Sequence, residues 1–334
     1  MSWTEILGHD SLVERFRNVL VNGRLGTTYL FVGPEGIGKR KFALELAKCL
    51  LCMKNSEEQL VACDECPSCQ QVMAGTNPDV MQVSKPQEKA FIPVDLLIGP
   101  QSKRMREGLC YDISRKPFYG KRKIAIIDDA DYFNQEGANA LLKTLEEPPA
   151  GSVLILVATG ERRQLATIRS RSQTIRFQPL QPQQVLQVLE QSDLLEDQSL
   201  APKLANASAG SVQRALQLAD VDVWEFREHL YQQLSSNDPT ADGFAKTIEE
   251  FVDAAGKEAA MKRMRMRSVC DMALSFYRQS MLDEEQESVS ENYANCIHRC
   301  IEAQHHSVAN MNQATLVECW LSDLGRLSRG ELVG

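Results

Sequence analysis

The chain has 334 residues, of which 43% are hydrophobic and 25% are charged, a composition typical of an ordinary globular protein with two or three domains. Its net charge of −8 repels nucleic acid at long range, so a contact with DNA would need a local basic patch or a partner subunit. No apolar run approaches the roughly 18 residues that cross a bilayer, and the first residues lack a secretory signal pattern, so we expect a cytoplasmic protein.

The first part of the chain predicts a helix followed by a phosphate-binding loop. Ser11 and Glu14 have the spacing of a capping box, which predicts that a helix begins there. Residues 29–40, YLFVGPEGIGKR, then predict a strand, a glycine-rich turn and a second helix, the setting of a phosphate-binding loop. Such a loop turns backbone N–H groups and a helix N-terminus towards an anion. The residues expected to contact nucleotide are Gly33, Gly36, Gly38 and Lys39.

Arg40 departs from the usual pattern of this loop. The pattern G-x-x-x-x-G-K-[ST] places a hydroxyl after the lysine, because that oxygen ligates the Mg²⁺ that bridges the outer phosphates. An arginine has five donors and no acceptor, so Arg40 cannot ligate a cation.

The next feature is a compact, cysteine-containing insertion over residues 52–69. Three cysteines have C-x-x-C-x-x-C spacing, and Cys52 lies just upstream. Four thiolates satisfy tetrahedral Zn²⁺, so we expect a structural zinc site without an open position. Cys49 is the main rival for the fourth place, but it lies inside a helical apolar pattern; unligated thiols are the alternative interpretation. The expected ligands are Cys52, Cys63, Cys66 and Cys69.

Short apolar runs of buried-strand type follow at residues 80–83, 124–127, 153–158 and 174–177. Helical patterns separate them, which predicts a mainly parallel α/β sheet. Asp128 and Asp129 follow the second run; an acid there can hold Mg²⁺ through water, and the next acid can orient the attacking water. The simpler interpretation is an ordinary acidic loop at a strand end.

Arg171 stands out in the loop before the last predicted strand, within Arg169-Ser-Arg-Ser172. An arginine here could stabilise the transferring phosphate on a neighbouring subunit. Taken alone, a pair of surface arginines is more often simply solvated.

The remainder of the chain is expected to be helical. Residues 180–219 predict three short helices that form a small second domain, and residues 220–334 predict a third, all-helical region with an acidic link at residues 283–291. A stripe of apolar residues near the end favours core or a subunit interface: Val317, Trp320, Leu321, Leu324 and Leu327. The basic run Lys262, Arg263, Arg265 and Arg267 is typical of a solvated helix face, with contact to DNA or a partner as the alternative.

Together these residues resemble the clamp-loader branch of the AAA+ ATPases over about the first 220 residues. The most specific piece is the run NALLKTLEEPP at residues 139–149, and residues 74–79 look less like the gamma/tau motor subunit. The resemblance implies an α/β P-loop (AAA+) parallel-sheet domain over residues 1–179, a small helical lid over 180–219 and an all-α C-terminal collar over 220–334. It also places Arg40 and Thr159 beside the nucleotide.

The family's task is to open a sliding clamp with ATP and to place it on primer-template DNA. The resemblance therefore implies gamma/tau and delta clamp-loader subunits as partners, with the clamp and DNA reached through the complex and no membrane involved. Within that complex, it implies a stator, a rigid subunit that does not drive the reaction with its own ATP site. Arg171 of this stator is expected to act as an arginine finger, a side chain supplied in trans to the ATP site of the adjacent gamma/tau subunit.

Several departures from the family pattern concern the chain's own ATP site. Arg40 replaces the Mg²⁺-binding hydroxyl, and Asp129 replaces the usual catalytic glutamate. The lid pattern Gly-Ser-x-Arg becomes residues 210–213, GSVQ, which lacks the phosphate-contacting arginine unless Arg214 substitutes for it. We therefore predict that the loop can hold ATP through Lys39 and its backbone but that hydrolysis is weak or absent. The alternative is an active, gamma/tau-like ATPase motor.

Overall fold

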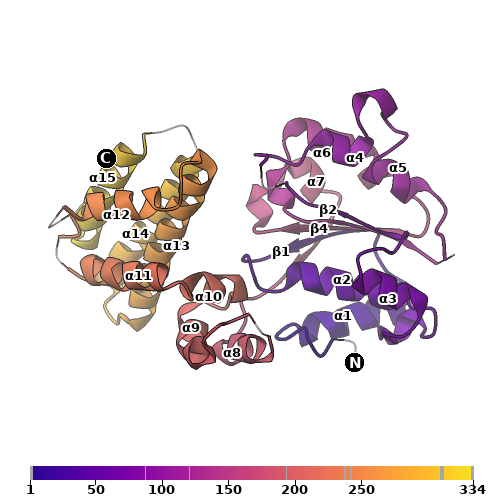
Figure 1. Ribbon diagram of the computed structural model, residues 1–334, viewed down its shortest axis with the longest axis horizontal. Helices are drawn as coiled ribbons and strands as arrows, with labels where there is room; N and C mark the ends of the chain where they lie inside the picture. Colours follow the sequence, from indigo (N-terminus) through magenta and orange to yellow (C-terminus); the bar gives the residue numbers. More distant parts are fainter. Residues whose placement is uncertain are drawn as a thin grey trace. The chain divides into compact units, whose positions relative to one another are not determined.

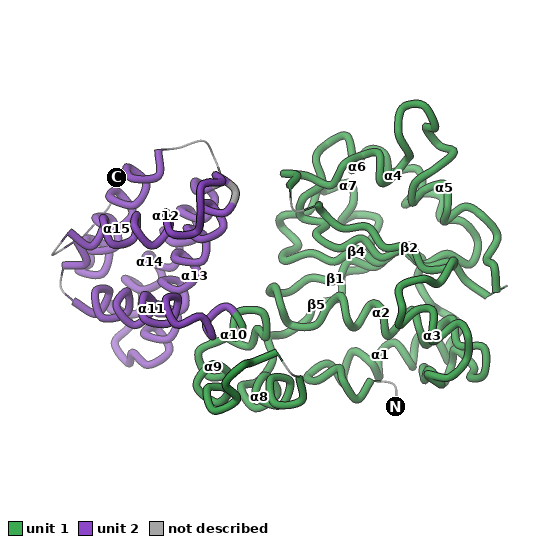
Figure 2. Tube along the Cα trace, viewed as in Figure 1, with its two compact units in different colours: residues 1–216 green, residues 217–334 purple. Residues whose placement is uncertain are grey.

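The structure is a computed structural model that describes residues 3–86, 88–119, 121–192, 194–236, 238–240, 243–308 and 312–331. The chain divides into two compact units, residues 1–216 and residues 217–334 (Figure 2). The division into a lid and a collar with boundaries at residues 179 and 219 stays a prediction, and each unit is described by itself below.

A five-stranded parallel sheet forms the centre of the first unit, as predicted. Its order is β2-β3-β4-β1-β5, and every strand pair is parallel. The inner strands β1, β3 and β4 are buried along their whole length, which explains why their sequences are apolar after the first residue of each strand. The strand bounds are β1 (Thr28–Val32), β2 (Val80–Val83), β3 (Lys123–Ile127), β4 (Ser152–Ala158) and β5 (Gln173–Arg176).

Helices cover both faces of this sheet (Figure 1). Alternate residues of β1 point to opposite faces, so Phe31 joins one core cluster and Leu30 joins the other. One face carries α1 (Asp10–Val21), α2 (Lys39–Leu50) and α3 (Pro67–Met73). The other carries α4 (Val94–Ile98), α5 (Leu109–Ser114), α6 (Gln135–Glu146) and α7 (Ala166–Arg169).

The predicted capping box at Ser11 is wrong. Helix α1 begins one residue earlier, at Asp10, with His9 as its N-cap and without a side-chain cap. The His9 imidazole instead contacts the Ile37 carbonyl oxygen, with 2.8 Å between Nε2 and O. A tertiary contact therefore outweighs the local capping preference at this helix end.

Three short helices follow the sheet, as the sequence predicted: α8 (Pro182–Gln191), α9 (Ala201–Ala207) and α10 (Val212–Leu218). Gly210 turns the chain into α10 with φ of +79°, and the Ser211 hydroxyl accepts a hydrogen bond from the Arg214 N–H at 3.2 Å. Ser211 thus satisfies one of the backbone donors at the start of the helix.

The second unit is helical in its described residues. It contains α11 (Val221–Leu234), α12 (Phe244–Asp253), α13 (Ala259–Asp283), α14 (Glu287–Val308) and α15 (Gln313–Ser328). Four members of the predicted apolar stripe are buried in its core: Val317, Trp320, Leu321 and Leu324. The expected acidic link at 283–291 is mostly wrong, because α14 already begins at Glu287, where an acidic side chain suits the positive helix end. Among the described residues, no helix is both long and apolar enough to cross a bilayer.

Candidate functional site

The predicted nucleotide residues gather where three neighbouring strands end. The loop Gly33–Gly38 follows β1, Asp128 follows β3 and Thr159 follows β4, and these strands lie side by side in the order β3-β4-β1. Gly38 is the N-cap of α2 with φ of +93°, a backbone conformation that glycine adopts without steric cost. The topology therefore builds the usual framework of a phosphate-binding loop.

Lys39 does not extend from this loop towards solvent. Its ammonium donates to the carbonyl oxygens of Gly33 and Pro34, at 2.6 and 2.5 Å, and the residue is only 6% exposed. Burial lowers the pKa of Lys39, although the nearby Glu35 carboxylate opposes that effect. Two of the three ammonium donors are thus directed at the loop's own backbone.

The beginning of α10 packs directly on the same loop. The Val212 N–H donates to the Gly36 carbonyl oxygen at 3.0 Å. A Cβ atom added to Gly36 would lie 2.4 Å from the Gln213 Cβ and 2.5 Å from the Ser211 hydroxyl oxygen. Gly36 is therefore required for close packing against α10 as well as for its φ of +72°.

Arg40 faces Asp128, the acid for which the sequence predicts a role in holding Mg²⁺. Its Nε is 3.7 Å from Asp128 Oδ2, and its Nη2 donates to Gln82 Oε1 at 3.3 Å. The Arg40 side chain is 55% exposed, so this ion pair is worth little as a stabilising contact. Its consequence is chemical, since the positive charge of Arg40 faces the carboxylate to which the sequence prediction assigns Mg²⁺.

The other acids after β3 have different surroundings. Asp129 has φ of +57°, and burial, followed by the neighbouring Asp128 carboxylate, raises its pKa. Asp131 accepts from the Thr159 N–H at 2.5 Å and from Gln164 Nε2 at 3.2 Å. Asp131 therefore fixes the loop that contains Thr159, a role that the sequence analysis did not assign to it.

Four cysteines form the one cluster among the described residues that could hold a metal ion: Cys52, Cys63, Cys66 and Cys69. Their sulfur atoms all lie within 4.8 Å of one another, and Cys63 and Cys69 are 4.0 Å apart. Zinc–sulfur bonds of about 2.3 Å in a tetrahedron require sulfurs roughly 3.8 Å apart, so the arrangement fits Zn²⁺. The rival Cys49 is buried in α2 and lies outside this cluster.

Backbone hydrogen bonds favour the thiolate form of Cys66 in particular. Burial raises the pKa of Cys66, but hydrogen bonds from the Met53 and Cys69 N–H groups outweigh it and lower the pKa to about 6. The pKa of Cys69 shifts the other way, because burial, followed by its hydrogen bond with Cys66, raises it. A metal would therefore have to displace the proton of that ligand as it binds.

Ion pairs attach the cysteine cluster to the sheet domain. Lys48 in α2 contacts Glu45 at 2.9 Å and Asp64, between two of the cysteines, at 2.7 Å. Arg122, just before β3, makes a two-point contact with Glu57 at 2.7 and 2.8 Å. The insertion is therefore bound to the helix that carries Lys39.

Arg171 lies at the opposite end of the sheet from the phosphate-binding loop. Val32, at the end of β1, is level with Arg176 of β5, whereas Tyr29 is level with Gln173. Arg171 precedes β5 by two residues, so it lies at least about 10 Å from the loop along the strand direction. Arg171 and the phosphate-binding loop therefore lie at opposite ends of two neighbouring strands.

Sequence reasoning missed one partner of Arg171. The guanidinium donates to Glu146 Oε1 at 2.6 Å, to the Thr167 carbonyl oxygen at 3.1 Å and to the Ser170 hydroxyl at 3.2 Å. Glu146 belongs to the run at residues 139–149 on which the family resemblance rested, so the sequence marked this segment as important. The run could not reveal that Glu146 contacts Arg171, because that contact arises from the fold.

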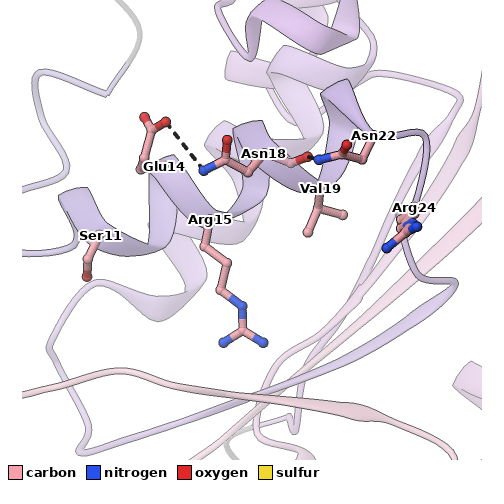
Figure 3. Close-up of a pocket in the computed structure, with 7 residues that line it drawn as sticks. All are labelled: Ser11, Glu14, Arg15, Asn18, Val19, Asn22 and Arg24. Carbon is pink, nitrogen blue, oxygen red and sulfur yellow. Dashed lines mark hydrogen bonds between the residues drawn. The ribbon is translucent and has the colours of Figure 1, made fainter.

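Two further features lie away from these sites. In the basic run of α13, Lys262 pairs with Asp253 at 2.7 Å, and the Arg265 guanidinium lies over the Phe251 ring, 4.6 Å from its centre. A surface hollow follows α1, where Arg15 and Arg24 are exposed (Figure 3). Its described lining consists of Ser11, Glu14, Arg15, Asn18, Val19, Asn22 and Arg24, so it contains none of the predicted site residues.

Comparison with known proteins identifies the family. The family model "DNA polymerase III, delta subunit" matches residues 8–181, more than half of the chain. DNA polymerase III subunit delta' of Bacillus subtilis (strain 168) is 31% identical, with 75% of this chain and 66% of the relative covered. Subunit delta' of Escherichia coli (strain K12) is 31% identical over 67% and 63% of the two chains. Subunit tau/gamma of Haemophilus influenzae is 30% identical over 66% and 30%.

The match thus spans less than two thirds of the length of these curated relatives. It includes the parallel sheet and the phosphate-binding loop, together with the cysteine cluster and the segment that carries Arg171. The family match and these identities show that the chain belongs to the delta-prime subunits of the DNA polymerase III clamp loader.

Proposed function

We propose that the protein is a stator of the clamp loader that does not consume ATP itself and that supplies Arg171 to the ATP site of an adjacent subunit. The observation that carries this proposal is the state of its own phosphate-binding loop. Lys39 donates to the loop carbonyls, α10 is seated on Gly36, and the Arg40 guanidinium faces Asp128. A catalytic site needs all of its positioned groups at once.

The position of Arg171 supports the second half of the proposal. Its side chain is 34% exposed and lies at the end of the sheet away from the chain's own loop. An arginine at that end can reach a triphosphate only if another subunit presents one. Gamma/tau subunits are the proposed recipients, since relatives of that name are similar to this chain.

The remaining assignments belong to the same proposal. The partners are the gamma/tau and delta subunits, through which the complex engages the sliding clamp and primer-template DNA. The four cysteines hold one structural Zn²⁺, and any ATP in the chain's own loop is bound without productive Mg²⁺ coordination. The protein acts in the cytoplasm.

Mutation of Arg171 in the assembled complex tests this function. The complex for this test keeps one active ATP site, that of the gamma/tau subunit next to Arg171, and its other ATP sites carry inactivating P-loop mutations. Arg171→Ala should reduce ATP turnover there by about 10³-fold or more, because an arginine supplied in trans contributes that much to phosphoryl transfer. Arg169→Ala, two residues away and also exposed, is the control and should leave turnover unchanged.

Two outcomes would contradict the stator. Unchanged turnover with Arg171→Ala would remove the role in trans. ATP hydrolysis that persists when all neighbouring sites are disabled, and that disappears with Lys39→Ala, would favour the gamma/tau-like motor instead.

A further inference from the structure

Arg171 is held by its own domain before any partner arrives. Three of the five guanidinium N–H donors are occupied by Glu146, the Thr167 carbonyl oxygen and the Ser170 hydroxyl, at 2.6, 3.1 and 3.2 Å. Among the described residues, the other two donors have no hydrogen-bond partner and could bind a phosphate. A long side chain that would otherwise sample many rotamers has one defined direction.

Glu146 is the only charged member of this set of acceptors. It is the last residue of α6, where the negative end of the helix disfavours a carboxylate unless a cation lies nearby. Arg171, which comes from the segment after α7, supplies that cation. The Arg171–Glu146 pair thus joins the end of α6 to the segment that carries Arg171.

The exposure of the pair indicates orientation rather than stabilisation of the fold. The side chains of Arg171 and Glu146 are 34% and 49% exposed. Exposed ion pairs contribute little to folding, so removal of this one should leave the melting temperature nearly unchanged. A misplacement of about 1 Å in a group that acts on the transition state can nevertheless cost about 10²-fold in rate.

We propose that Glu146 is a positioning residue for Arg171, which fixes the direction of the guanidinium towards the triphosphate of the adjacent subunit. This inference rests on the proposed function, because it concerns how the finger is presented. Glu146 itself touches no nucleotide; it acts through the arginine. The pair holds while two donors of Arg171 engage phosphate oxygens.

The test compares variants of Glu146 in the assembled clamp loader with only the adjacent motor site active. Glu146→Ala should lower kcat for ATP by about 10-fold or more, within the effect of a misplaced group, and should leave KM for ATP unchanged. Glu146→Gln, which keeps an oxygen acceptor, should recover part of the loss. The control Glu147→Ala, the neighbouring exposed acid, should behave like the wild type.

The double variant with Arg171→Ala separates positioning from other effects. In that background Glu146→Ala should cause no further loss, because the residue acts only through the arginine. If the single variant Glu146→Ala has normal kcat while the single variant Arg171→Ala is impaired, the inference is overturned and the proposed function stays intact. An equal loss in both backgrounds would also overturn it, whereas unimpaired Arg171→Ala would reject the proposed function itself.

Melting temperature and complex assembly are measured for each variant. If Glu146→Ala fails to fold or assemble, the comparison of Glu146→Gln with Glu147→Gln decides the matter. Here too, a loss confined to kcat and absent from the Arg171→Ala background supports the role, and wild-type kcat contradicts it.

Discussion

At the phosphate-binding loop, two cationic side chains contact groups of the protein itself. Arg40 faces Asp128 across 3.7 Å, and Lys39 donates to two carbonyl oxygens of its own loop. The sequence identified the first departure, because a missing hydroxyl is visible in a motif. It could not identify the second, because the lysine is the residue that the motif requires.

Replacement of Arg40 alone should therefore fail to restore an ATPase. Arg40→Ser returns the hydroxyl of the motif, but it leaves the Lys39 contacts and the Val212–Gly36 hydrogen bond in place. We expect hydrolysis by the isolated variant to stay within about twofold of the wild type, since a catalytic site with several altered groups is not rescued by one. Phosphate release and nucleotide binding, each with and without Mg²⁺, measure this.

Lys41→Ser is the matched control for this change, because Lys41 is adjacent and its ammonium pairs with the exposed Glu5 at 2.8 Å. Robust, Mg²⁺-dependent turnover in Arg40→Ser would show that the single substitution had silenced the site. In that case, nucleotide binding would have to break the contacts that Lys39 and α10 make with the loop.

At the scale of elements, the sequence predicted the strands closely but did not predict the tertiary contacts between elements. Strand β2 has the predicted bounds, and β4 begins one residue before the predicted run, at the buried Ser152. The buried run of β4 was visible in the sequence because a strand covered on both faces consists almost entirely of apolar residues. The seating of α10 on Gly36 joins segments about 175 residues apart, and no local pattern encodes it. The pair of Arg171 with Glu146 is likewise a product of the fold.

The cysteine insertion was predictable for a different reason. The spacing of Cys63, Cys66 and Cys69 itself reflects the geometry of a tetrahedral ion, so that part needed no knowledge of the fold. Its attachment through Lys48 to Asp64 was not predictable. That ion pair, in which the side chain of Lys48 is 11% exposed, links the cluster to helix α2.

Loss of the metal should accordingly destabilise the first unit. By elemental analysis, the double variant Cys66→Ser, Cys69→Ser should contain no zinc, whereas the wild type should contain about one ion per chain. We expect the first unit to melt about 4 °C or more below the wild type, which corresponds to at least about 1 kcal/mol at this size. Cys319→Ser removes an exposed cysteine of the second unit and should change neither quantity. A wild-type protein that contains no metal as purified and still folds with normal stability would refute the zinc site.

For the whole molecule, the sheet separates two chemical roles. The phosphate-binding loop follows the carboxyl end of β1, and Arg171 precedes the amino end of β5. Since these strands are parallel neighbours, the two features face opposite ends of the domain. In the proposed function, only the end that carries Arg171 meets a neighbouring subunit, so that role exists only in an assembly.

The charge of the whole molecule leads to the last prediction, that the isolated chain binds primer-template DNA only weakly. Its net charge is −8, and two members of the basic run in α13, Lys262 and Arg265, already contact Asp253 and Phe251. Non-specific binding depends on freely available cations, so we expect a Kd weaker than about 10⁻⁴ M at physiological salt. Fluorescence anisotropy with labelled DNA measures it. Tighter binding that weakens steeply with salt and is lost in Arg263→Ala, Arg267→Ala would instead show that this run contacts DNA directly.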